Sequence, residues 1–217
     1  MEVEKDDKFY RFKWFWNILR HGLFMHGLRN RLARIGIDIM PYYWVLEEAT
    51  PLSNPPKLRG KDISGFRVMN FDEKDVIKIK NSIIGIEQKD LLQYIREGQI
   101  CIGIKHNDEI AAYTFIKPDS FYFRDREFKF KANEVYLHSM YTFEKFRGKN
   151  MAPYLRYECY EMLKNENIDY KYSVSEYFNK STIRFKKKLN SEHKKLYLSI
   201  ILFGKITWNF TLKTFRG

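Results

Sequence analysis

Cysteine is scarce in this chain, and its scarcity argues against two kinds of site. Only Cys101 and Cys159 occur among 217 residues, and both fall within segments that have the composition of strands or helices. We therefore expect buried free thiols rather than a disulfide, which suits a reducing compartment. No cluster of Cys and His has metal-site spacing, so we expect no metal. Internal repeats and low-complexity tracts are missing as well.

The N-terminal part of the chain also lacks long apolar runs and, over one stretch, acidic residues. Between Lys8 and Arg34 there are seven Lys and Arg residues and no Asp or Glu. These charges interrupt every apolar run, which argues against a signal peptide and against a membrane-spanning helix here. We expect a cytoplasmic protein, with peripheral binding at the inner membrane face as an alternative.

The same stretch has the pattern of a basic amphipathic helix. Its apolar residues recur at helical spacing, and they are Phe12, Phe15, Trp16, Leu19, Leu23, Leu28, Leu32 and Ile35. Such a helix, residues 8–35, can lie in a membrane interface, pack on the rest of its own chain, or pack on a second subunit of a homodimer. The prolines that follow predict an irregular connector over residues 41–56. We thus expect an N-terminal extension, residues 1–60, and one domain over residues 61–217.

The overall composition is that of a packed, strongly basic protein. Hydrophobic residues make up 44% and aromatic residues 17% of the chain, and the net charge is +12. A chain with this composition forms a core. Its charge attracts phosphate-bearing small molecules, an acidic carrier protein or anionic lipid. Nucleic acid is a weaker candidate, because no recognised binding motif accompanies the charge.

Hydrophobic patterning predicts alternating strands and helices after residue 60. Helices are expected around residues 72–80 and 88–97. Strands are expected at residues 66–71, 100–104, 110–116, 134–142, 170–175, 196–203 and 207–215. Residues 100–116 have the pattern of a hairpin with a polar turn at 106–109, and residues 121–131 that of an extended second hairpin. In the last strand Trp208, Phe210 and Leu212 share one side.

A basic turn joins the 134–142 strand to the next helix. The turn contains Arg147, Gly148 and Lys149, and Pro153 falls in the first helical turn, where its missing N–H costs nothing. Backbone N–H groups at a helix N-terminus bind anions, and Gly148 allows close approach. On the functional interpretation, this turn is a cradle that binds a phosphate group. On the structural interpretation, it is a basic loop that only connects the strand to the helix.

The turn resembles the acyl-CoA-binding motif of the GNAT (Gcn5-related N-acetyltransferase) superfamily, Q/R-x-x-G-x-G/A. Arg147 matches the first position and Ala152 the last, while Asn150 replaces the central glycine. Asn tolerates a left-handed backbone, so the turn can survive this change. The resemblance implies that Arg147, Gly148, Lys149, Asn150, Met151 and Ala152 hold the pyrophosphate of CoA. It also implies that Met140, Tyr141 and Thr142 pair with the pantetheine arm.

A second segment is similar to the family's other CoA-side motif, N-x-x-A/S-x-x-φ-Y-x-x-x-G-F. The matching residues, which the resemblance assigns to CoA binding, are Asn179, Thr182 and Phe185. Leu189 fits as well, but Lys186 stands at the tyrosine and Asn190 at the glycine. The resemblance covers residues 64–203. It implies a mixed α/β (α+β) fold with a mostly antiparallel central sheet flanked by helices.

The reaction implied by the resemblance needs a base for the amine, an oxyanion donor and a departing thiolate. A backbone N–H near Tyr141 or Thr142 would serve the oxyanion. Strand alternation places Glu134, Tyr136, His138 and Met140 on one face. We expect His138 to be the base and Glu134 to be the second candidate. The alternative for His138 is a hydrogen-bonded core or cleft histidine without a catalytic role. The alternative for Glu134 is a surface carboxylate at the start of the strand.

The general acid is harder to assign, because the family's tyrosine is replaced by Lys186. Tyr177 is the candidate, or the thiolate leaves without a dedicated acid. A triad of Ser139, His138 and Glu134 is not expected, since neighbours on one strand point to opposite faces.

Three functions remain open from the sequence. The first is transfer of an acetyl group from acetyl-CoA to the primary amine of a small molecule or amino sugar. The second is transfer of a longer acyl chain from CoA or an acyl carrier protein at a membrane surface. The third is a non-catalytic domain of this shape that binds membrane or nucleic acid through its basic N-terminus.

Overall fold

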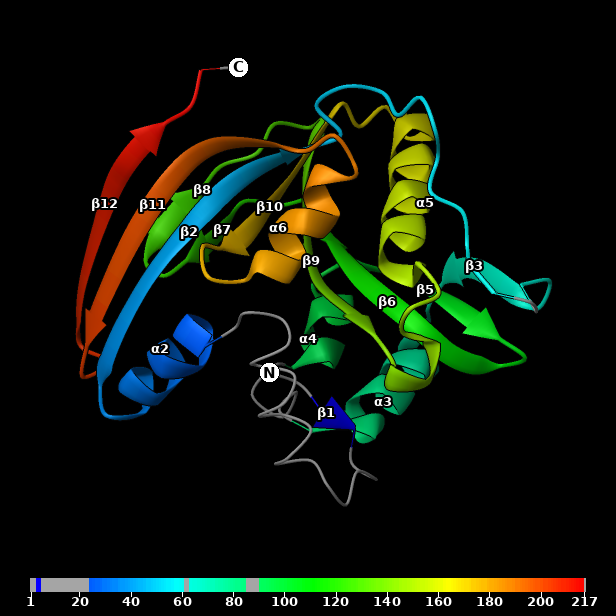
Figure 1. The fold of residues 1–217 in the computed structure, drawn as a ribbon, viewed down its shortest axis with the longest axis horizontal. Helices are drawn as coiled ribbons and strands as arrows, with labels where there is room; N and C mark the ends of the chain where they lie inside the picture. Colours follow the sequence, from blue (N-terminus) through cyan, green and yellow to red (C-terminus); the bar gives the residue numbers. More distant parts are fainter. Residues whose placement is uncertain (1–2, 5–23, 61–62, 85–89, 217) are drawn as a thin grey trace. The chain divides into compact units, whose positions relative to one another are not determined.

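The computed structural model describes residues 3–4, 24–60, 63–84 and 90–216 (Figure 1). Their contacts divide the chain into two compact units. Unit 1 contains residues 52–118 and 132–169 together with β1 (Val3–Glu4), and unit 2 contains residues 24–51, 119–131 and 170–216. Each unit is therefore assembled from separate stretches of sequence. Whether residues 1–60 form a separate extension stays a prediction.

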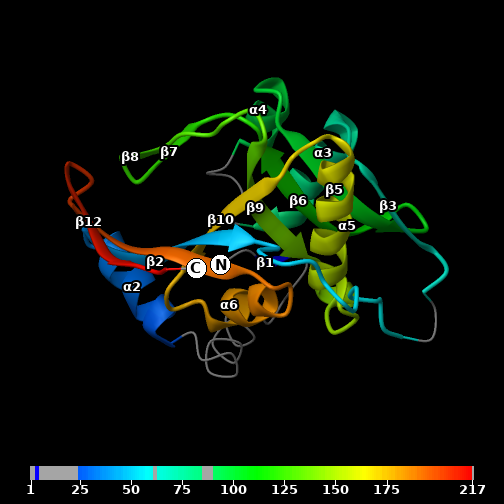
Figure 2. The ribbon, with the colours of Figure 1, turned by 90° about the horizontal axis from the view of Figure 1, so that it is seen from above.

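Unit 1 is built on four antiparallel strands. They follow the order β9, β6, β5, β3, and they are β3 (Phe66–Asn70), β5 (Ile100–His106), β6 (Glu109–Lys117) and β9 (Glu134–Thr142). A short strand β4 (Ile83–Ile84) pairs with β1. The helices are α3 (Glu73–Ser82), α4 (Leu91–Arg96), the 3₁₀ helix η1 (Glu144–Phe146) and α5 (Met151–Asn165). Figure 2 shows α5 on one side of this sheet and α3 and α4 on the other.

The core of unit 1 joins α3 and α4 to one face of the sheet. Val76 and Leu91 from these helices are buried against Tyr113 and Phe115 of β6. Gly103 is required on the same face, because a Cβ there would lie 2.1 Å from the ring of Phe71. Burial of these apolar side chains is the main stabilising contribution.

Unit 2 is built on four further antiparallel strands, in the order β12, β11, β2, β10. They are β2 (Ile37–Glu47), β10 (Tyr170–Glu176), β11 (Glu192–Leu202) and β12 (Ile206–Thr214). The hairpin of β7 (Phe121–Phe123) and β8 (Arg126–Phe128) packs rings of Phe121, Phe123 and Phe128 around Tyr42. Its turn residues, Arg124 and Asp125, both have positive φ, as a tight two-residue hairpin turn requires. Among the described residues of unit 2, the helices are α2 (Phe24–Arg34) and α6 (Lys180–Lys187).

The expected mixed α/β fold, with mostly antiparallel strands and flanking helices, is confirmed. The 100–116 and 121–131 hairpins are confirmed too, and both cysteines are buried free thiols. Residues 24–34 of the predicted amphipathic helix are helical, while residues 8–23 lie outside the described residues. Within the described ranges, no helix combines the length and apolarity needed to cross a bilayer.

The irregular connector predicted for residues 41–56 is wrong over its first part. Residues 41–47 belong to β2, an eleven-residue strand that pairs with β11 and β10. Pro41 is tolerated because β10 pairs with β2 only from Tyr42 onward, so β2 has no β10 partner at Pro41. Burial of Tyr42 and Val45 outweighs the local effect of the proline.

Candidate functional site

The strand–turn–helix predicted around residues 140–152 is present in unit 1. Strand β9 ends at Thr142, η1 follows, and α5 begins at Met151. Gly148 has φ +82°, and a Cβ built on it would meet nothing within 4 Å. Asn150, at the position of the motif's glycine, is left-handed with φ 64° and ψ 25°. The Asn therefore keeps the backbone shape that glycine gives this turn.

The start of α5 is suited to an anion. Asn150 makes no side-chain capping bond, and the first turn of α5 carries no acidic residue. The N–H groups that point out of a helix N-terminus thus meet neither a capping side chain nor a carboxylate of that turn. Phosphate oxygens match such donors in geometry and charge. These residues therefore fit a phosphate group.

Two cations flank this helix start, and other contacts hold each of them. The Arg147 Nε donates to the Thr142 carbonyl at 3.1 Å, and its Nη2 donates to the Tyr141 hydroxyl at 3.2 Å. The Lys149 Nζ lies 5.5 Å from the ring centroids of both Phe66 and Phe146. Cation–π contacts of this kind restrain a charge without neutralising it.

A segment that the sequence did not connect with this turn runs beside it. The Asn150 Nδ2 donates to the Lys57 carbonyl at 2.9 Å, and the Arg59 N–H donates to the Lys149 carbonyl at 3.0 Å. Lys57 and Arg59 are exposed, so they add positive charge next to the turn. No sequence signal could have indicated this, because both links involve main-chain atoms.

A β-bulge interrupts the pairing of β9 with β6. Tyr113 faces Tyr141 and Phe115 faces His138, so one residue of β6 stands opposite two of β9. Ser139, within the bulge, has φ 49°. The Thr114 hydroxyl donates to the His138 carbonyl at 3.0 Å. A bulge leaves an extra residue outside the ladder and redirects the side chains beyond it.

The bulge makes the predicted alternation along β9 wrong after His138. Residues opposite each other in an antiparallel pair share a face, and so do residues two apart in β6. Tyr141, opposite Tyr113, therefore shares the face of His138, opposite Phe115, and Met140 does not. The ring centroids of Tyr113 and Tyr141 are 6.1 Å apart, which agrees with this assignment.

His138 is half-buried, and both of its ring nitrogens are engaged. Its Nδ1 lies 2.9 Å from the Ser139 hydroxyl, and its Nε2 lies 2.7 Å from Gln99 Oε1. The rings of Tyr94 and Tyr136 lie 5.2 and 5.3 Å from it. The expectation that His138 and Ser139 point away from each other is wrong, because the positive φ of Ser139 turns the chain back. Gln99 is a neighbour that the sequence did not reveal.

Glu134, the second candidate base, opens β9 and is half-buried. It is thus at the far end of the strand from the turn. Across the described residues, no three His, Cys, Asp or Glu side chains are grouped as for a metal ion.

The remaining predicted residues lie in unit 2, on or next to α6. The Asn179 Oδ1 accepts from the Thr182 N–H at 3.1 Å, which caps the helix. Phe185 is half-buried on the same helix. Most of the motif segment is thus helical.

Lys186, which replaces the motif's tyrosine, forms a buried ion pair. Its Nζ donates to the Ser173 hydroxyl at 2.6 Å and the Val174 carbonyl at 3.1 Å, and it lies 3.5 Å from a Glu47 carboxylate oxygen. The side chains of Lys186 and Glu47 are 5% and 0% exposed. Lys186 therefore ties α6 to β2 and β10.

Tyr177 belongs to an aromatic stack in unit 2. It is 43% exposed, and its ring stacks 5.5 Å from that of Tyr43, which lies 3.8 Å from His193. Burial raises the pKa of Tyr43, and repulsion from Tyr177 adds to the increase. Burial also lowers the pKa of His193, helped by the charge of Lys186. The ring of Tyr177 thus stacks on Tyr43 while the residue stays partly exposed.

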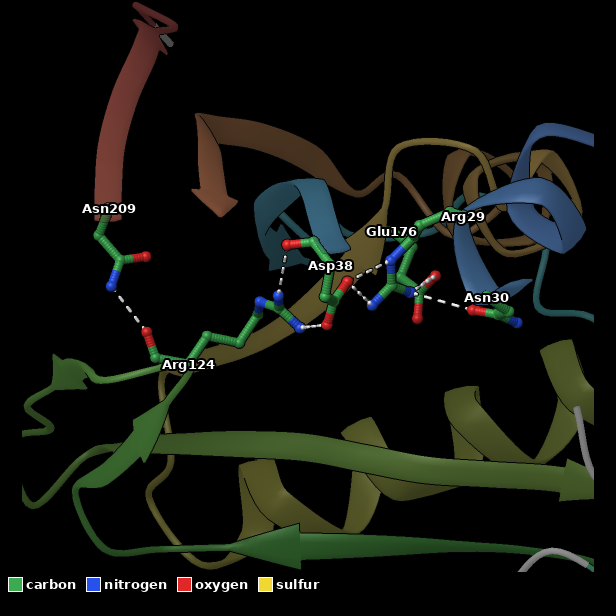
Figure 3. A network of polar contacts seen from close by, with 6 residues as sticks. All are labelled: Arg29, Asn30, Asp38, Arg124, Glu176 and Asn209. Carbon is green, nitrogen blue, oxygen red and sulfur yellow. Dashed lines mark hydrogen bonds and ion pairs between the residues drawn. The ribbon is translucent and has the colours of Figure 1, made fainter. Parts of the chain in front are cut away.

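An ion-pair network holds α2 within unit 2 (Figure 3). Arg29 contacts Asp38 at 2.8 Å and Glu176 at 3.1 Å, and Arg124 reaches the other Asp38 oxygen at 2.8 Å. The Asn209 Nδ2 donates to the Arg124 carbonyl at 2.7 Å. Arg29, one of the basic residues of the 8–35 segment, thus packs on its own chain, whereas Arg31 and Arg34 are exposed.

Comparison with known proteins adds a family and a fold. The model of the acetyltransferase (GNAT) family matches residues 71–190, more than half of the chain. No match is found among curated protein sequences. The solved structures that resemble the chain include a GNAT-family protein from Novosphingobium aromaticivorans, with a TM-score of 0.53, 15% identity, and coverage of 77% of this chain and 66% of that one.

Two further structures show the same likeness. An acetyltransferase of the GNAT family from Colwellia psychrerythraea has a TM-score of 0.52, 12% identity, and coverage of 80% and 60% of the two chains. A tandem GNAT protein from the clavulanic acid biosynthesis pathway has a TM-score of 0.52, 12% identity, and coverage of 85% and 58%. The chain spans between 58% and 66% of the length of these three structures. At these identities the likeness is one of fold.

Proposed function

The chain belongs to the acetyltransferase (GNAT) family, and from this premise we propose that it transfers an acetyl group from acetyl-CoA to the primary amine of a small molecule or amino sugar. Family and fold support acyl transfer from CoA. The acceptor class rests on the family resemblance as a whole, because both matched motifs concern CoA.

The observation that carries the proposal is the turn before α5. It combines a left-handed Asn150, an open Gly148 and a helix start without acidic residues. The matched family region, residues 71–190, contains the whole turn. We assign the pyrophosphate to residues 147–152 and the pantetheine arm to residues 140–142. The contacts of Asn179, Thr182 and Phe185 with CoA stay a prediction from the second motif.

The proposed reaction is direct attack of the amine on the thioester carbonyl. His138, or Glu134 as second choice, takes the proton from the amine, and a backbone N–H near Tyr141 or Thr142 stabilises the oxyanion. The carbon–sulfur bond then breaks, and CoA leaves as a thiolate. The buried bonds of Lys186 make it a poor proton donor. Tyr177 supplies the proton, or the thiolate leaves unprotonated.

The test of the donor site compares two glycine variants. Gly148 and Gly204 both have positive φ, and a Cβ on either would meet nothing within 4 Å. Gly148→Glu and Gly204→Glu thus impose similar backbone strain, but only Gly148→Glu places a carboxylate in the cradle. We expect calorimetry to show CoA binding weakened at least about tenfold by Gly148→Glu, and near wild type for Gly204→Glu. Equal affinities in the two variants would place the site elsewhere.

The donor and the acceptor are identified by a kinetic panel. Thiol release from acetyl-CoA is followed with a set of amines and amino sugars, and then with acyl-CoA and acyl carrier protein of increasing chain length. A preference for long chains would favour the second function. A wild-type protein that binds neither CoA nor acyl-CoA would leave only the non-catalytic one.

Peripheral binding to an anionic membrane is a second proposal, supported by unit 2. Trp208, Phe210 and Leu212 of β12 are 45%, 47% and 54% exposed. The chain from residue 193 to residue 216 carries five Lys and Arg residues and no acidic one. Exposed aromatic residues with positive neighbours are typical of a surface that contacts anionic lipid. We therefore propose β12 as the contact surface, in addition to the exposed part of α2.

A further inference from the structure

Gln99 is a buried side chain that joins His138 to a carboxylate. It is 5% exposed, its Oε1 lies 2.7 Å from His138 Nε2, and its Nε2 donates to Glu97 Oε2 at 3.3 Å. We infer that Gln99 is a positioning residue that keeps the neutral His138 protonated on Nε2, so that Nδ1 takes the proton in the reaction. The inference rests on the proposed function of His138 as the base.

The orientation of the Gln99 amide follows from its two neighbours. A carboxylate oxygen only accepts hydrogen bonds, so the NH₂ group of the amide must face Glu97. The carbonyl oxygen then faces His138, and it too can only accept. His138 Nε2 must therefore carry a hydrogen. The reversed amide would set two oxygens against each other at Glu97.

Glu97, whose side chain is 42% exposed, has two further contacts besides the one with Gln99. The Gln93 Nε2 donates to its other oxygen at 2.7 Å, and the Lys117 Nζ lies 3.9 Å away. Glu97 and Lys117 are thus the charged groups of this chain of contacts, while Tyr94, Tyr136 and Phe115 surround the imidazole with rings.

The remaining ring nitrogen faces Ser139. With a hydrogen on Nε2, the neutral Nδ1 accepts from the Ser139 hydroxyl at 2.9 Å. When Nδ1 gains a proton, it donates to the same hydroxyl oxygen, so both charge states of His138 keep two hydrogen bonds. The amine proton can pass to the Ser139 oxygen as the hydroxyl proton moves to Nδ1. Ser139 is unchanged at the end, and His138 holds the proton.

The bulge in β9 makes this arrangement possible. On a regular strand Ser139 would point away from His138. The positive φ of Ser139, 49°, brings the hydroxyl to the ring instead. The bulge and Gln99 together thus select which imidazole nitrogen is available.

The tautomer can be measured without turnover. In protein labelled with ¹⁵N-histidine, long-range ¹⁵N–¹H spectra distinguish a protonated Nε2 from a protonated Nδ1, and His138→Ala identifies the signal. We expect the wild type to show Nε2–H, and Gln99→Met to lose this preference. The double variant Glu97→Gln/Gln99→Glu should keep it, because the new carboxylate accepts from Nε2–H and from the amide that replaces Glu97. Gln93→Met, which removes a different contact of Glu97, should leave it unchanged.

Kinetics supply the second readout. We expect Gln99→Met to lower kcat at least about tenfold with little change in the KM for acetyl-CoA, and Glu97→Gln/Gln99→Glu to recover part of the loss with a shifted pH–rate profile. A wild-type signal from Nδ1–H, or an unchanged tautomer in Gln99→Met, would overturn the inference. The turnover rate of His138→Ala is measured as a separate test of the proposed base. Wild-type rates in that variant would remove His138 as the base, and with it the part of the inference that concerns the reaction.

Discussion

At the scale of single residues, asparagine stands in for glycine at two left-handed positions. Asn150 and Asn190 have φ 64° and 53°, and both occupy positions where the family motifs carry glycine. The side chains add bonds that glycine lacks. Asn190 Nδ2 donates to the carbonyls of Thr50 and Pro51 at 3.4 and 3.2 Å. Asn thus keeps the turn and also anchors a neighbouring segment.

Replacement of Asn190 separates these two contributions. Asn190→Ala should lower the free energy of unfolding by about 1–2 kcal/mol, because alanine is strained at this φ. Asn190→Gly should cost about half of that or less, since it loses only the two long side-chain bonds. Urea unfolding measures both. Asn165→Ala, at the end of α5, is the control and should be neutral or slightly stabilising. Equal losses for Asn190→Ala and Asn190→Gly would contradict the argument from backbone strain.

Lys186, which stands where the family motif carries a tyrosine, makes buried contacts in unit 2. Its bonds to Ser173 and Val174, and its pairing with Glu47, are all inside unit 2. Lys186→Met should destabilise the fold by roughly 3–5 kcal/mol, because it leaves the carboxylate of Glu47 buried without this cation.

The matched control is Lys187→Met, since Lys187 is exposed on the same helix. It should change the unfolding free energy by no more than about 0.5 kcal/mol. In a double-mutant cycle, Glu47→Gln should recover part of the loss in Lys186→Met. A Lys186→Met variant as stable as Lys187→Met would show that the pair does not hold α6.

At the scale of elements, the Asp38 network joins α2, β2, β10 and the β7–β8 hairpin (Figure 3). Burial by itself would raise the pKa of Asp38, but hydrogen bonds and charge from Arg124 and Arg29 hold it below its ordinary value. A carboxylate with a lowered pKa adds stability above the pKa of the unfolded chain, near 3.8. That stability disappears as the pH falls through the lower folded value.

Asp38→Asn should therefore destabilise the fold by about 2 kcal/mol at pH 7, and the difference from wild type should shrink below about pH 4. Thermal or urea unfolding between pH 7 and pH 3 measures it. Asp119→Asn, at an exposed residue, is the control. A difference that stays constant down to pH 3 would exclude the ionised Asp38 as the source.

At the scale of the whole molecule, the net charge of +12 and the exposed side chains of β12 predict binding to anionic vesicles. Co-sedimentation should be stronger with phosphatidylglycerol than with phosphatidylcholine vesicles, and weaker in high salt. The double variant Trp208→Ser/Phe210→Ser should bind about tenfold more weakly, because two aromatic side chains no longer enter the interface.

Tyr122→Ser is the matched control, since Tyr122 is 71% exposed on β7 and outside the β12 surface. It should bind vesicles like the wild type. Equal binding to both lipids would argue against the membrane proposal. A dimer in analytical ultracentrifugation that the β12 double variant abolishes would assign this surface to a second copy of the chain.

The sequence by itself determined most elements of this protein and the turn before α5. Period-two patterns, turn residues and the helix start are local properties, so the hairpins, α5 and the left-handed Asn150 could be predicted. The fold class was predicted from the resemblance to two family motifs. Their order and spacing along the chain are typical of a single fold. The roles of the predicted site residues stay predictions.

Only the tertiary structure decided which faces the side chains of β9 occupy. It also decided which carboxylates pair with Arg29 of α2 and with Lys186. The bulge depends on the partner strand, which one strand's own sequence does not encode. Pro41 could enter β2 because β10 pairs only with the residues after it. Gln99 reached His138, and Glu47 reached Lys186, across long stretches of chain. Such contacts depend on packing between distant segments, which local patterns do not contain.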